Sequence, residues 1–282
     1  MENLLEGVID THVHSAPDII ERRYTDLELS RLASARGAAA IVLKSHHGDT
    51  AARAADCEEH LRLSQSGGKC RIFGGVTLNY ACGGLNPEAV RISLKLGGKV
   101  VWMPTVDSAN DRAKHGRSGG ISILGQDGEL LSEALDILRL ASDAGAILAT
   151  GHLSPREIYA LAREAKRTGF EKLVVTHPEY WVVGLTHLQQ RDLAENYGAV
   201  LERCCRQPLA GGQWTDNAAD TLSLIDEMGW ERVILATDGG QTVSPPWDEE
   251  FSAYIGSMYA HGLGREAVEH MTRTLPAKLL GI

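Results

Sequence analysis

The sequence lacks the cysteine patterns that stabilise small secreted domains or structural zinc sites. It has an odd number of cysteines and no Cys-x-x-Cys spacing; they are Cys57, Cys70, Cys82, Cys204 and Cys205. This usage fits a reducing compartment better than a disulfide framework. We therefore expect most of these cysteines to act as small buried apolar residues.

Signals for membranes and nucleic acids are missing too. No apolar run approaches the ~20 residues of a membrane span, and the amino terminus has no signal-peptide pattern. The formal net charge is −9, whereas nucleic-acid binding depends on clustered lysine and arginine. We expect a cytoplasmic protein that acts on a small molecule and has neither a membrane nor a nucleic-acid partner.

What the sequence does contain is a regular alternation of two patterns. Hydrophobic residues make up 43% of the chain, enough for a sizeable core. Short β-branched runs recur along it, at residues 7–10, 39–43, 72–77, 99–102, 146–149, 172–175, 199–201 and 232–236. Segments with helical spacing, such as 26–36 and 217–228, lie between most of them.

Helix-start signals fall at the expected places in this alternation. Ser154-Pro155-Arg156-Glu157 is a capping box with proline at the first helical position, and it predicts a helix to about Thr168. Asn86-Pro87 and Thr186-His187-Leu188-Gln189 are similar starts. Eight strand-like runs alternating with helices predict a (β/α)8 barrel that forms a single domain over residues 1–282. An open doubly wound sheet is the alternative, but no Gly-x-Gly-x-x-Gly turn follows the first strand.

One segment, residues 114–129, interrupts the alternation after the fourth strand. It holds a short alternating run, Ile121 to Leu124, followed by Gln126-Asp127-Gly128. This predicts a short β-hairpin insertion. Because loops at this face of a barrel carry function, the insertion is a candidate lid, and a purely decorative role is the alternative.

Metal-capable side chains recur where the predicted strands end. His12 and His14 are two residues apart, so on a strand they project from one face. The other strand ends supply single side chains: Lys44, His152, His177, Glu202 and Asp238. In a barrel these ends meet at one face and can build a site.

This ordered set resembles the amidohydrolase superfamily of metal-dependent barrels. The matching motifs are Asp10-Thr11-His12-Val13-His14, Thr150-Gly151-His152, Thr176-His177-Pro178 and Ala236-Thr237-Asp238-Gly239. The resemblance implies metal ligands at His12, His14, His152 and Asp238, with zinc as the default ion and manganese or iron as alternatives. It also implies that Asp238 is the general base for a metal-activated water, whose pKa falls towards ~7.

The sequence departs from two-metal members of the superfamily at the fourth strand. Val100-Val101-Trp102-Met103-Pro104-Thr105 has no lysine or glutamate to bridge two ions. We therefore favour one ion, with His177 as an electrophile or proton donor. In the alternative, His177 holds a second ion and Glu202 or a modified Lys44 acts as the bridge.

The predicted reaction is hydrolysis of an amide, lactone or related C–N or C–O bond. Residues near the same barrel end are candidates for substrate binding, namely Lys44, His46, Arg203, Tyr80 and Gln241. The alternatives are a non-oxidative decarboxylase of the same superfamily, a phosphoesterase and a non-catalytic metal-binding barrel. Barrels of this kind often pair, so a homo-oligomer is compatible with the sequence.

Overall fold

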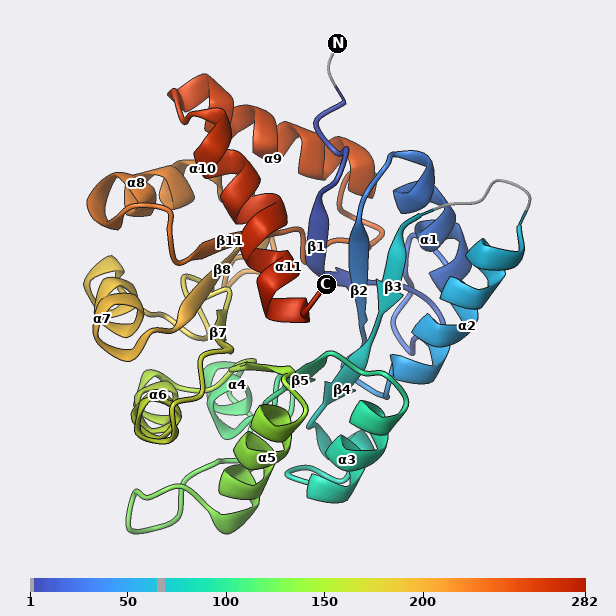
Figure 1. The fold of residues 1–282 in the computed structure, drawn as a ribbon. Coiled ribbons are helices and arrows are strands. Elements are labelled where there is room, and N and C mark those ends of the chain that lie inside the picture. Colours follow the sequence, from blue (N-terminus) through green and yellow to red (C-terminus); the bar gives the residue numbers. More distant parts are fainter. Residues whose placement is uncertain (1–2, 65–68) are drawn as a thin grey trace.

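The computed structural model describes residues 3–64 and 69–282, and it shows helices arranged around parallel strands (Figure 1). The strands are β1 (Ile9–His14), β2 (Ala40–Lys44), β3 (Arg71–Phe73), β4 (Gly75–Thr77), β5 (Val100–Trp102), β6 (Ile147–Ala149), β7 (Leu173–Thr176), β8 (Val200–Cys204), β9 (Arg206–Pro208), β10 (Trp214–Asp216) and β11 (Val233–Ala236). Each predicted β-branched run therefore corresponds to an observed strand or pair of strands.

The helices lie mostly between consecutive strands. They are α1 (Asp26–Ala35), α2 (Ala51–Leu63), α3 (Pro87–Lys95), α4 (Ala109–Lys114), α5 (Ser132–Asp143), α6 (Pro155–Thr168), α7 (His187–Tyr197), α8 (Ala218–Met228), α9 (Trp247–His261), α10 (Arg265–Glu269) and α11 (Leu275–Leu280), with a 3₁₀ turn at Tyr80–Cys82 and a π-helical turn at His270–Thr274.

The predicted helix starts are confirmed in detail. Ser154 caps α6 by accepting a hydrogen bond from Glu157 N, and the Glu157 side chain accepts from Ser154 N in return. Gly169 ends this helix in the left-handed conformation at φ +73°. Thr186 and Gln189 form the same reciprocal box at the start of α7. Short-range capping chemistry thus sets where these helices begin and end.

The parallel strands form two hydrogen-bonded sheets, in the orders β1-β2-β3 and β11-β8-β7-β6-β5-β4. The predicted third strand is divided into β3 and β4 at Gly74, where a Cβ atom would lie 2.3 Å from the Thr50 carbonyl oxygen. The close approach of the Thr50 backbone explains both the break in the strand and the need for glycine.

Hydrogen bonds join the carboxyl end of β1 to the residues that directly follow β11. Asp238 N donates to His12 O at 2.9 Å, and His14 N donates to Gly239 O at the same distance. The parallel α/β architecture is therefore confirmed. However, within residues 3–64 and 69–282 the two parallel sheets are not joined by continuous strand pairing into one closed barrel.

Apolar side chains from most of the strands pack together in the interior that the strands enclose. The Trp102 side chain is fully buried there, together with Ile9, Val42 and Val100. Leu275 and Leu279 of α11, which crosses the middle of Figure 1, belong to the same cluster.

The predicted hairpin position is wrong. In residues 114–129 the turn forms, because Gly125 N donates to Glu129 O at 2.8 Å, but only isolated bridges flank it. The antiparallel pairing stops at Leu124 and Leu130, because Ile121 pairs with Ser108 instead. A hairpin occurs instead after β8, where β9 pairs with β10 in antiparallel register around Gly212, which has φ +80°.

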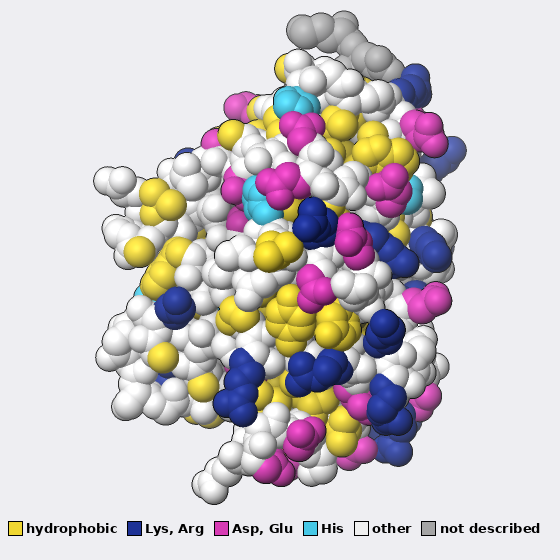
Figure 2. Space-filling view, turned by 90° about the vertical axis from the view of Figure 1, so that its left-hand side faces the viewer, with side chains coloured by type: hydrophobic (Ala, Val, Ile, Leu, Met, Phe, Trp, Pro, Cys, Tyr) yellow, Lys and Arg dark blue, Asp and Glu magenta, His cyan; other side chains and the backbone are white. Residues whose placement is uncertain are grey.

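Within the described part of the chain, no helix is both long and apolar enough to cross a membrane. Figure 2 shows one face of the molecule, on which basic and acidic side chains are interspersed with small groups of hydrophobic ones. No single sign of charge dominates this face.

Candidate active site

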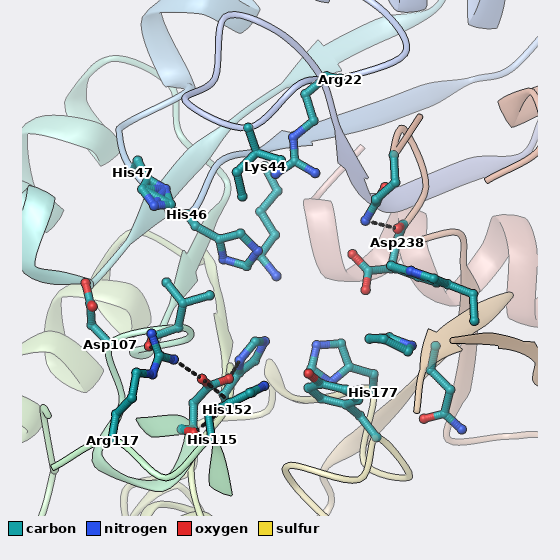
Figure 3. A pocket seen from close by; sticks show the side chains of 18 residues that line it. Arg22, Lys44, His46, His47, Asp107, His115, Arg117, His152, His177 and Asp238 are labelled. Atoms are coloured by element: carbon teal, nitrogen blue, oxygen red, sulfur yellow. Dashed lines mark hydrogen bonds and ion pairs between the residues drawn. The ribbon is translucent and has the colours of Figure 1, made fainter. Parts of the chain in front are cut away.

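A cavity of about 540 Å³ opens at the carboxyl ends of the strands (Figure 3). This volume lies within the range typical of small-molecule sites. Five histidines line the cavity: His46, His47, His115, His152 and His177. Cationic and acidic side chains line it as well, including Arg22, Lys44, Arg117, Asp107, Asp111 and Asp238.

Beneath the cavity, the two histidines of β1 converge on Asp238. Its Oδ1 lies 2.9 Å from His12 Nε2 and 3.1 Å from His14 Nε2. Asp238 has φ +48°, a left-handed conformation that costs a non-glycine residue about 1–3 kcal/mol. Its backbone hydrogen bond to His12 holds this conformation. The ligand atoms of His12, His14 and Asp238 are close enough to bind one metal ion.

The electrostatics of this cluster fit a cation. Burial alone would lower the pKa of His12, but the Asp238 carboxylate raises it, to about 9. Burial and the Arg22 guanidinium lower the pKa of His14 to about 3. Burial opposes ionisation of Asp238, yet the His12 charge holds the pKa of that carboxyl well below its usual range. The proton on His12 thus supplies the positive charge that stabilises the Asp238 carboxylate between the two imidazoles. A divalent ion can take the place of this proton.

Two buried carboxylates orient imidazoles from behind. Glu202 Oε1 lies 2.8 Å from His12 Nδ1, and Asp111 Oδ2 lies 2.7 Å from His152 Nδ1. Such contacts fix the ring and its tautomer, as they do for metal-ligating histidines in general. The Nε2 atom of His152 is therefore left as a hydrogen-bond acceptor or metal ligand, and that of His12 becomes a ligand when a divalent ion replaces its proton.

Sequence reasoning missed Asp111. It lies in the first turn of α4, where an acidic residue has an ordinary explanation in the helix dipole. In the structure its Oδ1 also lies 3.0 Å from His115 Nδ1 and 3.0 Å from an Arg117 nitrogen. Segment 114–129 thus reaches the cavity through His115 and Arg117, which are tied to the carboxylate that orients His152.

Glu202 is not placed to bridge ions beside His177. It lies behind His12, where its Oε2 accepts a hydrogen bond from Thr11 Oγ1 at 3.4 Å. His12, Glu202 and Cys204 form a second compact group of potential ligands, and all three are buried. Burial raises the pKa of the Cys204 thiol well above its usual value, so the thiol stays protonated and is a poor ligand.

Lys44 ends β2 with its Nζ 2.8 Å from His12 Nε2. The side chain is buried, and burial lowers its pKa. Asp18 pairs with Arg22 at 2.8 Å. Arg22 lines the cavity with a side chain only 3% exposed, and no local sequence pattern indicated its role.

His152 and His177 lie on the other side of the cavity floor, with ring centroids 5.0 Å apart. His177 is 5.9 Å from the His12 ring and has φ +27°. Its Nδ1 is buried without a hydrogen-bond partner among the described residues. The structure does not bring His152 into the compact group formed by His12, His14 and Asp238.

His46 occupies the wall between these two groups. Its ring centroid is 4.9 Å from that of His14 and 5.9 Å from that of His152. Its Nδ1 lies 2.8 Å from Thr105 Oγ1, and Asn79 Nδ2 lies 2.6 Å from the same hydroxyl oxygen. The sequence predicted His46 at the site, but no role was assigned there to Thr105 or Asn79.

Of the remaining residues predicted to bind substrate, Gln241 lines the cavity, whereas Tyr80 and Arg203 do not. Gln241 lines the cavity, and its Nε2 donates to Asp238 O at 2.9 Å. Tyr80 does not line it and is 55% exposed. Arg203 does not line the cavity, because alternation along β8 points its fully buried side chain to the opposite side of the strand from Glu202. Its partners there are Glu179, Gln190, Asp220 and Thr221.

Several solved structures share this architecture. An amidohydrolase from Pseudomonas aeruginosa is similar with a TM-score of 0.67 and 13% identity, over 99% of this chain and 98% of that one. The probable dipeptidase PvdM from the same organism has a TM-score of 0.68 and 10% identity, over 99% and 96%. Enamidase, described as a member of the amidohydrolase superfamily, has a TM-score of 0.62 and 14% identity, over 99% and 68%.

These similarities confirm that the chain has the fold of the amidohydrolase superfamily. No curated protein matches the sequence. A family model matches residues 7–202, well over half of the chain, and its description is a family of unknown function, DUF6282. The chain therefore belongs to the DUF6282 family.

Proposed function

We propose that this protein is a metal-dependent hydrolase that cleaves an amide, lactone or related C–N or C–O bond in a small molecule. The observation that carries the proposal is the convergence of His12 Nε2 and His14 Nε2 on Asp238 Oδ1 beneath the cavity. The likeness to an amidohydrolase, a probable dipeptidase and enamidase supports the reaction class.

The ion would be held by His12, His14 and Asp238. Imidazole nitrogens with one carboxylate suit zinc first, and manganese or iron also fit. When bound, a divalent ion lowers the pKa of water and offsets negative charge on a carbonyl oxygen. One ion is favoured over two, because Glu202 and Lys44 are both engaged with His12 and do not bridge towards His177.

The chain's own residues supply the proton transfers. The pKa of Asp238 is far below neutrality, so its carboxylate is available to accept a proton and later to return it to the leaving group. Burial holds the pKa of His177 well below its usual value, so this ring is neutral at pH 7. A neutral His177 would polarise a carbonyl oxygen by hydrogen bonding.

A non-oxidative decarboxylase is the second candidate. The observation that favours it is the nearly buried Arg22 guanidinium on the cavity wall, since a decarboxylase must bind a substrate carboxylate. Lys44, offered for this role from the sequence, is less suitable because it faces His12.

The test begins with metal analysis of the purified chain loaded with zinc, manganese or iron. We expect about one ion per chain. His14→Asn should lose the ion, whereas His60→Asn on the exposed face of α2 should keep it. The loaded protein is then assayed on a panel of amides, lactones and esters, with CO₂ release from unsaturated acids and hydrolysis of a chromogenic phosphate measured in parallel.

Hydrolysis that a chelator removes and added metal restores would support the proposal. Release of CO₂ without hydrolysis would replace it with the decarboxylase, and phosphate release would favour a phosphoesterase. A chain that holds its ion but leaves the whole panel untouched would be a non-catalytic metal-binding barrel. Two ions per chain would overturn the single-ion assignment.

A further inference from the structure

The imidazoles around the cavity differ in what holds their Nδ1 atoms. His12 and His152 each face a carboxylate, Glu202 and Asp111 respectively. An ionised carboxylate only accepts hydrogen bonds, so Nδ1 of each ring must carry the hydrogen. The Nε2 atom of His152 then presents a lone pair, and that of His12 does so when a metal ion replaces its proton.

His46 faces a different partner, the hydroxyl of Thr105, and the direction of that hydrogen bond depends on Asn79. Asn79 Oδ1 accepts from Thr105 N at 2.9 Å and from Asp107 N at 3.3 Å. The amide orientation is therefore fixed, and Asn79 Nδ2 donates to Thr105 Oγ1 at 2.6 Å and to His46 O at 2.9 Å.

The hydrogen of the Thr105 hydroxyl then has one available acceptor. Among residues 3–64 and 69–282, the contacts of Thr105 Oγ1 are the Asn79 donor and His46 Nδ1. Because Asn79 Nδ2 cannot accept a hydrogen bond, the hydroxyl donates to His46 Nδ1. An accepting Nδ1 in a neutral ring leaves the hydrogen on Nε2.

The His46 ring is neutral and borders the cavity. Because its Nδ1 accepts the Thr105 hydrogen, that nitrogen carries no proton of its own, and the ring cannot be the doubly protonated cation. The ring lines the cavity beside Lys44 and lies across from His152 and His177 (Figure 3). Its Nε2–H is thus a hydrogen-bond donor close to the group formed by His12, His14 and Asp238.

We propose that His46 binds a substrate oxygen through its Nε2–H and is not a metal ligand, and that Asn79 and Thr105 hold it in this tautomer. This assignment rests on the proposed function for its substrate. The substrate must then present an oxygen acceptor, a carbonyl or a carboxylate, to the wall formed by β2 and the loop after β5. A donor held there stabilises negative charge that develops on a carbonyl oxygen.

The first test is direct and does not need activity. Histidine is labelled with ¹⁵N, and long-range ¹H–¹⁵N correlation spectra of the metal-free and zinc-loaded full chain report which ring nitrogen carries hydrogen. We expect hydrogen on Nε2 of His46 but on Nδ1 of His152, and on Nδ1 alone of His12 once zinc replaces its second proton. His46→Gln assigns the His46 signals. Hydrogen on Nδ1 of His46 would overturn the proposal.

A second measurement separates ligand from donor. In protein loaded with ¹¹³Cd, coupling between the metal and ¹⁵N should appear for His12 and His14 and be absent for His46. Coupling to His46 Nε2 would overturn the proposal. If the protein bound no metal at all, the proposed function would fail, while the spectra of the metal-free protein would still decide the tautomer.

The matched variants are Thr105→Val and Thr105→Ser. Valine keeps the shape but removes the hydroxyl, so His46 should lose its tautomer preference and kcat for hydrolysis should fall about 10–100-fold, with metal content unchanged. Serine keeps the hydroxyl and should restore both the tautomer and the rate. His47→Gln, on a neighbouring ring, should leave the His46 tautomer unchanged. Loss of metal in Thr105→Val, or an unchanged His46 tautomer, would contradict the proposal that Asn79 and Thr105 hold His46 in this tautomer.

Discussion

Two walls of the cavity use histidine in different ways. On the charged wall, formed by Asp238 with His12, His14 and Glu202 packed beneath it, the imidazoles lie between carboxylates and compete for protons. On the neutral wall, formed by His46 with Thr105 and Asn79 behind it, an amide, a hydroxyl and an imidazole pass hydrogen bonds in one direction. Both walls are largely shielded from water and lie within a few ångströms of each other.

The difference teaches that the group behind a histidine determines what the ring offers to the cavity. A carboxylate behind the ring leaves an Nε2 lone pair in front, suited to a cation. A donating hydroxyl behind the ring leaves an N–H in front, suited to an oxygen of the substrate. The cavity therefore has separate places for an electrophilic ion and for the substrate atom that the ion activates.

The largest expected effect comes from removing the acid of the charged wall. Asp238→Asn keeps the shape of the side chain but cannot accept a proton, so turnover should fall about 10²–10⁴-fold. Circular dichroism should be unchanged, and steady-state kinetics with saturating metal gives the rate. Asp136→Asn, on the exposed face of α5, is the control. Retained activity in Asp238→Asn would remove Asp238 from proton transfer.

A smaller effect is expected behind His12. Glu202→Gln weakens the preference for hydrogen on His12 Nδ1, and metal affinity should fall about 10–100-fold in competition with a chromogenic chelator. Cys204→Ser should leave the affinity unchanged, because the protonated thiol is not a ligand. If Cys204→Ser lowered the affinity as much as Glu202→Gln, the ion would lie in the buried group behind His12 and not beneath the cavity.

The sequence predicted the charged wall better than the neutral one. A two-residue period brings His12 and His14 to one face of a strand, and this regularity is local. Polar residues at strand ends then identify Asp238, because parallel strands present these ends together. The alternation and the capping boxes predicted most strand and helix positions for the same local reason.

The rest depends on contacts between distant positions. Thr105 lies 59 residues from His46, and Asp111 lies 41 residues from His152. Neither partner belongs to a local motif, so the direction of these hydrogen bonds could not be read from the sequence. The hairpin was predicted at Gln126-Asp127-Gly128 from turn chemistry, but a hairpin also needs two flanking strands that pair with each other, and Ile121 pairs with Ser108 instead. Those strands are found after β8.

The smallest effect concerns the stability cost of the charged wall. Glu250 of α9 lies behind Gly239, and neither of its carboxyl oxygens has a hydrogen-bond partner among the described residues. Burial raises the pKa of Glu250 to about 8, which the charge of Arg206 only partly opposes. In the unfolded chain this group ionises near pH 4.5. The contribution of this neutral carboxyl to the free energy of unfolding is therefore fully present below pH 4.5. It is lost as the pH rises through about 8.

Glu250→Gln removes this titration. The variant should unfold like the wild type near pH 4.5 and be more stable than it by about 1–3 kcal/mol near pH 8. Urea unfolding of both proteins at several pH values measures the difference, with Glu249→Gln on the exposed side of α9 as the control. Parallel pH profiles for Glu250→Gln and wild type would mean that Glu250 is ionised in the folded protein. The charged wall would then have a further carboxylate behind it, compensated by Arg206, and the contrast with the neutral wall would be sharper than the hydrogen bonds alone indicate.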